Sequence, residues 1–151
     1  MRTGRPGGVR FGSLVHGVLE LIPFDSDVDV EPFVHQQARL LDATEEERLA
    51  ALEAVRSALC HPLIVRAAAS ADCRREAPFA HSPSPGEFLE GTIDLVFSEE
   101  QSGERRWVVV EFKTSAGDDE TTRRYGIQLQ TYIDAVTTAT GEEVEGTLLI
   151  V

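Results

Sequence analysis

Cysteine is scarce in this chain of 151 residues, which contains only Cys60 and Cys73. Their spacing matches no metal-binding motif, and two thiols are too few for a disulfide framework. We therefore expect a reduced, cytoplasmic setting. The sequence also lacks an apolar run long enough to span a membrane and an N-terminal stretch of the signal-peptide kind, so we expect no membrane association.

Positive charge is in short supply, because 14 Lys and Arg residues stand against 26 Asp and Glu residues, for a net charge of −12. Phosphate neutralisation dominates affinity for nucleic acid, so this balance argues against a free-standing nucleic-acid binder. It leaves open a metal-dependent site that acts on DNA delivered by another protein. No G-x-x-x-x-G-K-[ST] stretch is present, and we expect no ATP site in this chain.

The length favours one domain that buries a substantial core. We expect a flexible lead-in over residues 1–10, which are rich in Gly, Arg and Pro, and a single domain over residues 11–151. An N-terminal helical segment follows from apolar residues at helical spacing and from the capping box that Thr44 forms with Glu47. The helices are expected over residues 11–22, 32–43, 45–60 and 62–70.

The pattern changes to strands after residue 71, with strands expected over residues 73–80, 88–97, 105–112 and 144–151. A polar hairpin loop is expected at 98–104, and a helix over 123–138 with Gly141 as its C-terminal cap. The order predicts an α/β fold in which a small mixed central sheet is flanked by helices.

Lys113 is the only lysine of the chain, and it follows Glu111 at the end of the apolar strand "WVVVEFK". Residues two apart on a strand share a face, so an ion pair at the strand end is the simplest interpretation. Asp94 lies on the preceding strand. If it shares the face of Glu111 and Lys113, a metal site becomes an alternative to the simple ion pair. Two carboxylates with open coordination positions suit Mg²⁺ or Mn²⁺, and a compact ammonium can orient water or neutralise charge in a way that a planar guanidinium does not.

Asp94 with "EFK" resembles the D…(D/E)-x-K signature of the PD-(D/E)XK nuclease superfamily. Three further segments, "GSLVHGVLE", "REAPF" and "YGIQLQTY", resemble motifs of its RecB-like branch, in particular the C-terminal nuclease domains of AddA-type and RecB-type helicase–nucleases. The resemblance covers nearly the whole chain and implies a restriction-endonuclease-like core.

The resemblance also implies a set of site residues. His16, Asp94, Glu111 and the backbone carbonyl of Phe112 are the expected metal ligands, with Lys113 as a catalytic residue. Gln128 and Tyr132, four apart on a helix, are expected to contact the nucleic-acid backbone or to support the site. Five further residues are candidates for supporting the site, although a purely structural role explains them equally well: Glu76, Glu20, Tyr125, Arg123 and Arg124.

The function implied is a Mg²⁺- or Mn²⁺-dependent deoxyribonuclease that processes DNA ends or single strands exonucleolytically in recombination or repair. The implied partner is a helicase motor, and the chain is expected to be a fragment or a relative of a larger helicase–nuclease. The implied location is cytoplasmic and nucleoid-associated. Two cysteines cannot supply the four ligands of the iron–sulfur cluster found in some relatives, so none is expected. The alternative is an inactive nuclease fold that serves as a docking or DNA-gripping module.

Overall fold

The computed structural model describes residues 4–151, so residues 1–3 of the expected lead-in lie outside the described part. The chain divides into two compact units. The first contains the described residues up to Ala68 together with 113–115 and 150–151, and the second contains 69–112 and 116–149. The single domain expected over 11–151 stays a prediction.

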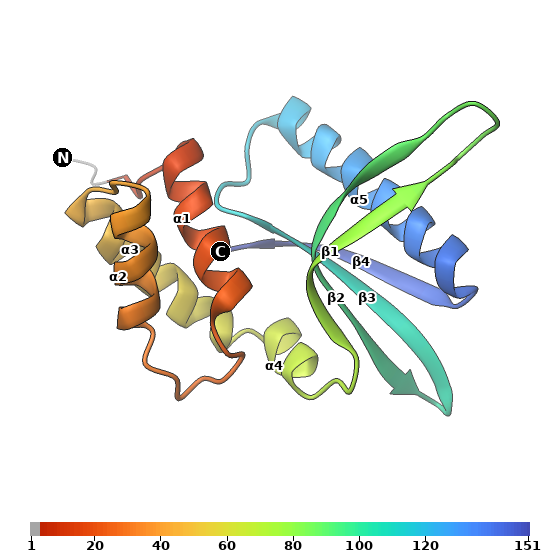
Figure 1. Cartoon of the computed structure of the whole chain (residues 1–151), viewed down its shortest axis with the longest axis horizontal. Helices are drawn as coiled ribbons and strands as arrows, with labels where there is room; N and C mark the ends of the chain where they lie inside the picture. Colours follow the sequence, from red (N-terminus) through yellow and green to blue (C-terminus); the bar gives the residue numbers. More distant parts are fainter. Residues whose placement is uncertain (1–3) are drawn as a thin grey trace. The chain divides into compact units, whose positions relative to one another are not determined.

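The first unit is helical, as the apolar spacing predicts (Figure 1). Its core is formed by residues on the inward faces of the helices, among them Phe11, Leu14 and Val55, all of which are fully buried. Within the described residues, no helix of either unit has the length and apolar composition that a membrane crossing needs. The four helices are α1 (Val9–Leu21), α2 (Glu31–Leu40), α3 (Glu45–Leu59) and α4 (Pro62–Ala68).

The capping box at the start of α3 is present and also ties α3 to α1. The Thr44 hydroxyl accepts a hydrogen bond from the Glu47 N–H at 3.2 Å, and the Glu47 carboxylate accepts one from the Thr44 N–H at 2.8 Å. The same carboxylate pairs with Arg10 at 2.9 Å. Arg10 is thereby held in the first turn of α1, which begins at Val9, two residues before the predicted start at Phe11.

Thr44→Ala removes the side-chain half of this cap, and we expect it to lower the free energy of unfolding by about 1 kcal/mol. Thr138→Ala, at an exposed position of the last helix, is the matched control and is expected to stay within about 0.5 kcal/mol of the parent. Urea denaturation measures both. Equal losses in the two variants would contradict the role of the cap.

The second unit is a mixed four-stranded sheet in the order β1-β2-β3-β4, with one helix on it (Figure 1). Tyr132 of that helix packs onto Ile93, Val96, Trp107 and Val109 of the sheet. The predicted α/β class, with its restriction-endonuclease-like arrangement of a mixed sheet and helices, is confirmed. The elements are β1 (Cys73–His81), β2 (Leu89–Gln101), β3 (Glu104–Lys113), α5 (Asp119–Thr140) and β4 (Glu143–Ile150).

The hairpin between β2 and β3 is longer than predicted, because residues 98–101 and Glu104 continue the strands instead of forming a loop. The turn consists of Ser102 and Gly103 alone, with φ of 55° and 82°. Two positive φ angles in a row give the tight hairpin turn whose twist matches that of the strands. An ion pair between Glu99 and Arg106, at 3.0 Å, holds the added rungs together.

The helix α5 begins four residues before the predicted Arg123 and ends at Thr140, two residues after the predicted end, with Gly141 as its C-terminal cap as predicted. The Asp118 carboxylate accepts the Thr121 N–H at 2.8 Å, so the acidic run "DDETT" caps the helix and forms its first turn. Around Leu129 and Ile133, α5 lies close to β4. A Cβ at Gly146 would come within 2.6 Å of Ile133, so only glycine permits this approach.

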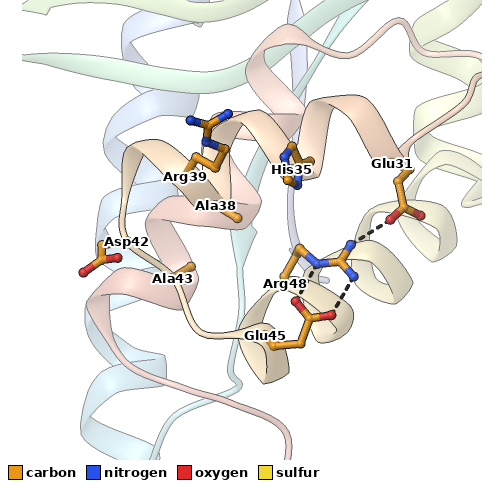
Figure 2. Close-up of a pocket in the computed structure, with 8 residues that line it drawn as sticks. All are labelled: Glu31, His35, Ala38, Arg39, Asp42, Ala43, Glu45 and Arg48. Atoms are coloured by element: carbon orange, nitrogen blue, oxygen red, sulfur yellow. Dashed lines mark hydrogen bonds and ion pairs between the residues drawn. The ribbon is translucent and has the colours of Figure 1, made fainter.

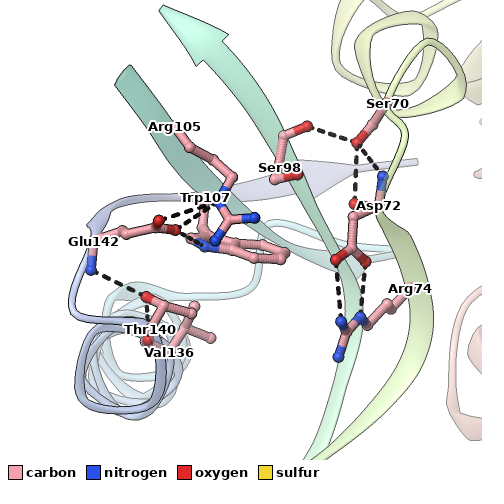
Figure 3. Close-up of polar contacts among 9 residues, drawn as sticks. All are labelled: Ser70, Asp72, Arg74, Ser98, Arg105, Trp107, Val136, Thr140 and Glu142. Carbon is pink, nitrogen blue, oxygen red and sulfur yellow. Dashed lines mark hydrogen bonds and ion pairs between the residues drawn. The ribbon is translucent and has the colours of Figure 1, made fainter. Parts of the chain in front are cut away.

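Trp107 is the only tryptophan, and its indole is fixed at the start of β4 (Figure 3). Its Nε1 donates to Glu142 Oε2 at 2.7 Å. Arg105 donates to the same carboxylate at 2.9 Å. The hydrogen bond from Arg105, followed by that from Trp107, holds the pKa of the Glu142 carboxyl below its ordinary value of 4.5.

Because the pKa of Glu142 is lowered on folding, its contribution to stability is present above pH 4.5 and is lost as the pH falls through its folded-state pKa. Trp107 reports this event directly. We expect its fluorescence to titrate below pH 4.5 in the parent and not in Glu142→Gln, whose side chain has no carboxyl proton to bind. An identical titration in both proteins would contradict the assignment.

Candidate active site

Two carboxylates face each other across β2 and β3. The antiparallel ladder between β2 and β3 ends at the pair of Leu95 and Val110, and Asp94 and Glu111 are the next residues of the two strands beyond that pair. Directly opposed residues project from the same face of a sheet. The Phe112 N–H donates to Asp94 Oδ2 at 2.8 Å, so the Asp94 side chain is held against the backbone of β3. The alternation of side chains along each strand therefore favours the expected shared face of Asp94 and Glu111.

The Glu111 carboxylate lies in the interior, with 5% of the residue exposed. Its Oε2 atom is buried and accepts no hydrogen bond from any described group. Burying a carboxylate is costly unless a counter-charge lies nearby. Together with half-buried Asp94, this residue concentrates negative charge in a poorly solvated place.

Glu76 on β1 extends the acidic row. The ladder between β1 and β2 pairs Arg75 with Leu95 and Ala77 with Ile93. Glu76 and Asp94 lie between these two pairs, and the ladder is interrupted there. The backbone of Glu76 has φ of 48°, which is uncommon for any residue other than glycine. Such strained positions gather at functional sites. Three carboxylates thus follow one another across three adjacent strands.

Tyr132 of α5 lies near enough to Glu111 and Asp94 to feel their charges, and Gln128 is bonded to it. Gln128 Nε2 donates to the Tyr132 hydroxyl oxygen at 2.8 Å, as their four-residue spacing allows. Burial, and then the negative charges of Glu111 and Asp94, raise the pKa of Tyr132 to about 12. The hydrogen bond from Gln128 lowers this pKa, and Glu76 raises it by a smaller amount. The hydroxyl consequently keeps its proton at neutral pH and is available as a donor.

Phe79 of β1 is a site neighbour that the sequence alone did not indicate. Its ring meets that of Tyr132 edge to face, with centroids 5.1 Å apart. Gly91 on β2 leaves the room for it, since a Cβ there would lie 2.9 Å from the Phe79 ring. The only signal in the sequence was a glycine in a strand, which marks a close approach without naming the partner. Phe79 therefore positions the ring of Tyr132.

Lys113 is the last residue of β3, two positions after Glu111, and belongs to the first unit. Its backbone carbonyl accepts the Val151 N–H at 2.9 Å, and its side chain is half-buried. Phe112, between them, is 3% exposed. The catalytic role of Lys113 and the ligand role of the Phe112 carbonyl stay predictions.

His16 and Glu20 lie one turn apart on α1 in the first unit, with His16 half-buried and Glu20 exposed. His16 therefore belongs to a different unit from the two carboxylates, and its role as a ligand stays a prediction. On α5, Tyr125 is half-buried, and Arg123 and Arg124 are exposed in the first half of the helix. Their supporting roles also stay predictions.

The donors in the second unit fit a hard divalent cation. Across residues 4–151, no three side chains of His, Cys, Asp or Glu gather closely enough to hold a metal ion by themselves. The pair of Asp94 and Glu111 supplies two carboxylates, whose oxygens are hard donors. Mg²⁺ sites commonly use one or two carboxylates and complete the coordination with water and substrate phosphate. The pair matches that requirement.

The mixed sheet with its paired carboxylates defines this protein as a restriction-endonuclease-like domain with the donors of a metal-dependent nuclease. A family profile described as the PD-(D/E)XK nuclease superfamily matches residues 3–151. The chain belongs to this superfamily, whose nucleases generally use divalent metals. No curated protein matches the chain.

We expect Mn²⁺ to raise the midpoint of thermal unfolding, since a ligand at a hundred times its Kd stabilises the folded state by about 2.7 kcal/mol. Asp94→Asn and Glu111→Gln should abolish the increase. Glu143→Gln, at an exposed position of β4, removes the same charge and should preserve it. Equal Mn²⁺-induced shifts in all four proteins would place the ion elsewhere.

Proposed function

We propose that this domain is a metal-dependent deoxyribonuclease of the RecB/AddA-like branch, which hydrolyses phosphodiester bonds exonucleolytically at DNA ends or in single strands. The observation that carries the proposal is the opposed pair of Asp94 and Glu111, fixed by the Phe112 N–H and placed under Gln128 and Tyr132. Membership of the nuclease superfamily supports the reaction class.

The proposed ligands of the ion are Asp94, Glu111, the Phe112 carbonyl and His16. A bound Mg²⁺ or Mn²⁺ supplies Lewis-acid polarisation of the scissile phosphate and lowers the pKa of a coordinated water. The chain's own contribution is to hold two carboxylates in place before substrate arrives and to keep Glu111 out of bulk water. Preorganised groups of this kind need no rearrangement when the reaction occurs.

Lys113 is proposed to orient the attacking water and to neutralise charge that develops on the phosphate. An ammonium is a compact point charge, whereas a guanidinium is a broad planar fork. In a chain with one lysine among 14 basic residues, that distinction accounts for the lysine at this place. Tyr132, protonated at neutral pH, is proposed to donate to a phosphate oxygen, with Gln128 holding its hydroxyl in position.

The RecB/AddA-like assignment is supported by the order of the motif segments, from the helix that carries His16 to the helix that carries Gln128 and Tyr132. A helicase motor is the proposed partner, because a net charge of −12 disfavours unaided capture of DNA. The proposed setting is DNA repair or recombination. The second candidate is an inactive module that docks or grips DNA in a repair complex, and the net negative charge fits docking on a protein partner better than gripping DNA.

Degradation of single-stranded DNA in Mn²⁺ separates the two candidates. We expect Asp94→Asn and Lys113→Ala to lose activity by about a hundredfold or more, the loss typical of a removed transition-state interaction. Lys113→Arg keeps the charge and should lose activity as well, because its shape is wrong. Parent-level activity in the Asp94 and Lys113 variants would contradict the mechanism, and no activity in the parent would favour the inactive module.

His16 is tested separately through metal affinity. If it is a ligand, His16→Ala should require a higher Mn²⁺ concentration for half-maximal activity, with the activity at saturating Mn²⁺ reduced less. His35→Ala, on another helix of the same unit, is the control. An unchanged Mn²⁺ requirement would remove His16 from the proposed coordination sphere.

A further inference from the structure

An apolar groove of about 380 Å³ lies in the second unit between α5 and the strands β1, β2 and β3. Its floor is buried, since Val96 and Trp107 are 5% and 6% exposed. Its walls come from Phe79 on β1 and from Ala135 and Ala139 on α5. The small alanine side chains leave this space between helix and sheet open.

The groove and the candidate active site are related through one face of α5. Gln128, Tyr132, Ala135 and Ala139 recur at helical spacing and share one face of α5. The first two lie over the carboxylates, and the last two line the groove. From Tyr132 to Ala139 is about 10 Å along the helix axis. The neighbouring nucleotide of a strand bound at the carboxylates can reach that far.

No carboxylate lines this groove, although the chain contains 26 Asp and Glu residues. Two other hollows of the described chain do contain carboxylates. The hollow between α2 and α3 is lined by Glu31, Asp42 and Glu45 among others (Figure 2), and one beside the β2–β3 hairpin is lined by three glutamates. In an acidic protein, a groove free of carboxylates next to a phosphate site is complementary to a polyanionic strand.

The charge that does reach the groove is positive. Arg74 lines the groove, and its guanidinium carbon lies 6.0 Å from the centroid of the Trp107 ring. The guanidinium carbon of Arg105 lies 5.6 Å from the same centroid. Arg74 is paired with Asp72 at 2.8 Å, but the Arg74 side chain is 64% exposed (Figure 3). Exposed pairs of this kind contribute little and can be exchanged for a phosphate partner.

We propose that this groove binds an unstacked nucleobase of the DNA strand whose backbone lies at Asp94 and Glu111. The flat apolar base packs against Trp107 and Phe79, and Arg74 meets its polar edge or the adjoining phosphate. Because a paired base cannot enter such a groove, the groove selects single-stranded DNA. This inference rests on the proposed nuclease function and names its substrate.

The test compares a single strand of thymidines with a strand of equal length that lacks bases, both in Ca²⁺, with recovery of intact strand as the check on cleavage. Trp107, the only tryptophan, reports contact through fluorescence quenching. We expect the thymidine strand to bind at least about fivefold more tightly, since stacking of one base on an aromatic ring contributes that much or more. Equal affinities of the two strands for the parent protein would overturn the proposal.

Ala139→Phe fills the groove at an exposed position of α5, and Thr138→Phe adds the same ring on another face of that helix. The thymidine preference should disappear in Ala139→Phe and remain in Thr138→Phe. Arg74→Gln should weaken thymidine binding more than Arg39→Gln, which removes the same charge in the first unit. Retention of the full preference by Ala139→Phe would overturn the assignment of the groove.

The outcomes separate this inference from the proposed function. Asp94-dependent cleavage of the thymidine strand, combined with equal affinities for the two strands, would overturn the nucleobase site and leave the nuclease intact. A base preference that depends on Ala139, in a protein without cleavage activity, would support the groove and favour the DNA-gripping module.

Discussion

The hydrogen bond from the Phe112 N–H to Asp94 is the interaction on which the site depends. It forms just beyond the pair of Leu95 and Val110, where the antiparallel ladder of β2 and β3 ends. The Asp94 side chain cannot turn away without leaving a nearly buried N–H group unpaired, and that loss costs about 1–3 kcal/mol. The two carboxylates are therefore held as a pair by the sheet itself. In the proposed function, these preorganised donors are the ligands of the divalent cation.

This arrangement concentrates negative charge, and the surrounding structure accommodates it in two ways. Phe79 and Gln128 hold Tyr132 over the carboxylates, so that a protonated hydroxyl faces them. The neighbouring groove carries Arg74 and no carboxylate, although the chain as a whole has a net charge of −12. If the proposed DNA strand binds, its attraction is expected near the site, where the proposed cation and the groove would act together.

Much of the architecture was predictable from local chemistry. The capping box of Thr44 and the C-terminal Gly141 each act through neighbours in sequence, and each is present. The errors fell where local signals compete. The "DDETT" run is polar enough to suggest a loop, yet Asp118 caps a helix with it. The turn at residues 102–103 places a serine at positive φ, where glycine or asparagine is the usual signal.

The candidate site was predictable only in part, for the same physical reason. Asp94 and Glu111 were recognisable because the alternation of side chains along two strands of a hairpin predicts a shared face. The contact of Phe79 with Tyr132 joins residues 53 positions apart in the sequence and has no local signature. The most direct test of the account is a Mn²⁺-soaked crystal examined by anomalous scattering. The account predicts a peak within about 2.5 Å of both an Asp94 and a Glu111 oxygen. A well-occupied ion elsewhere, with these carboxylates turned apart, would contradict it.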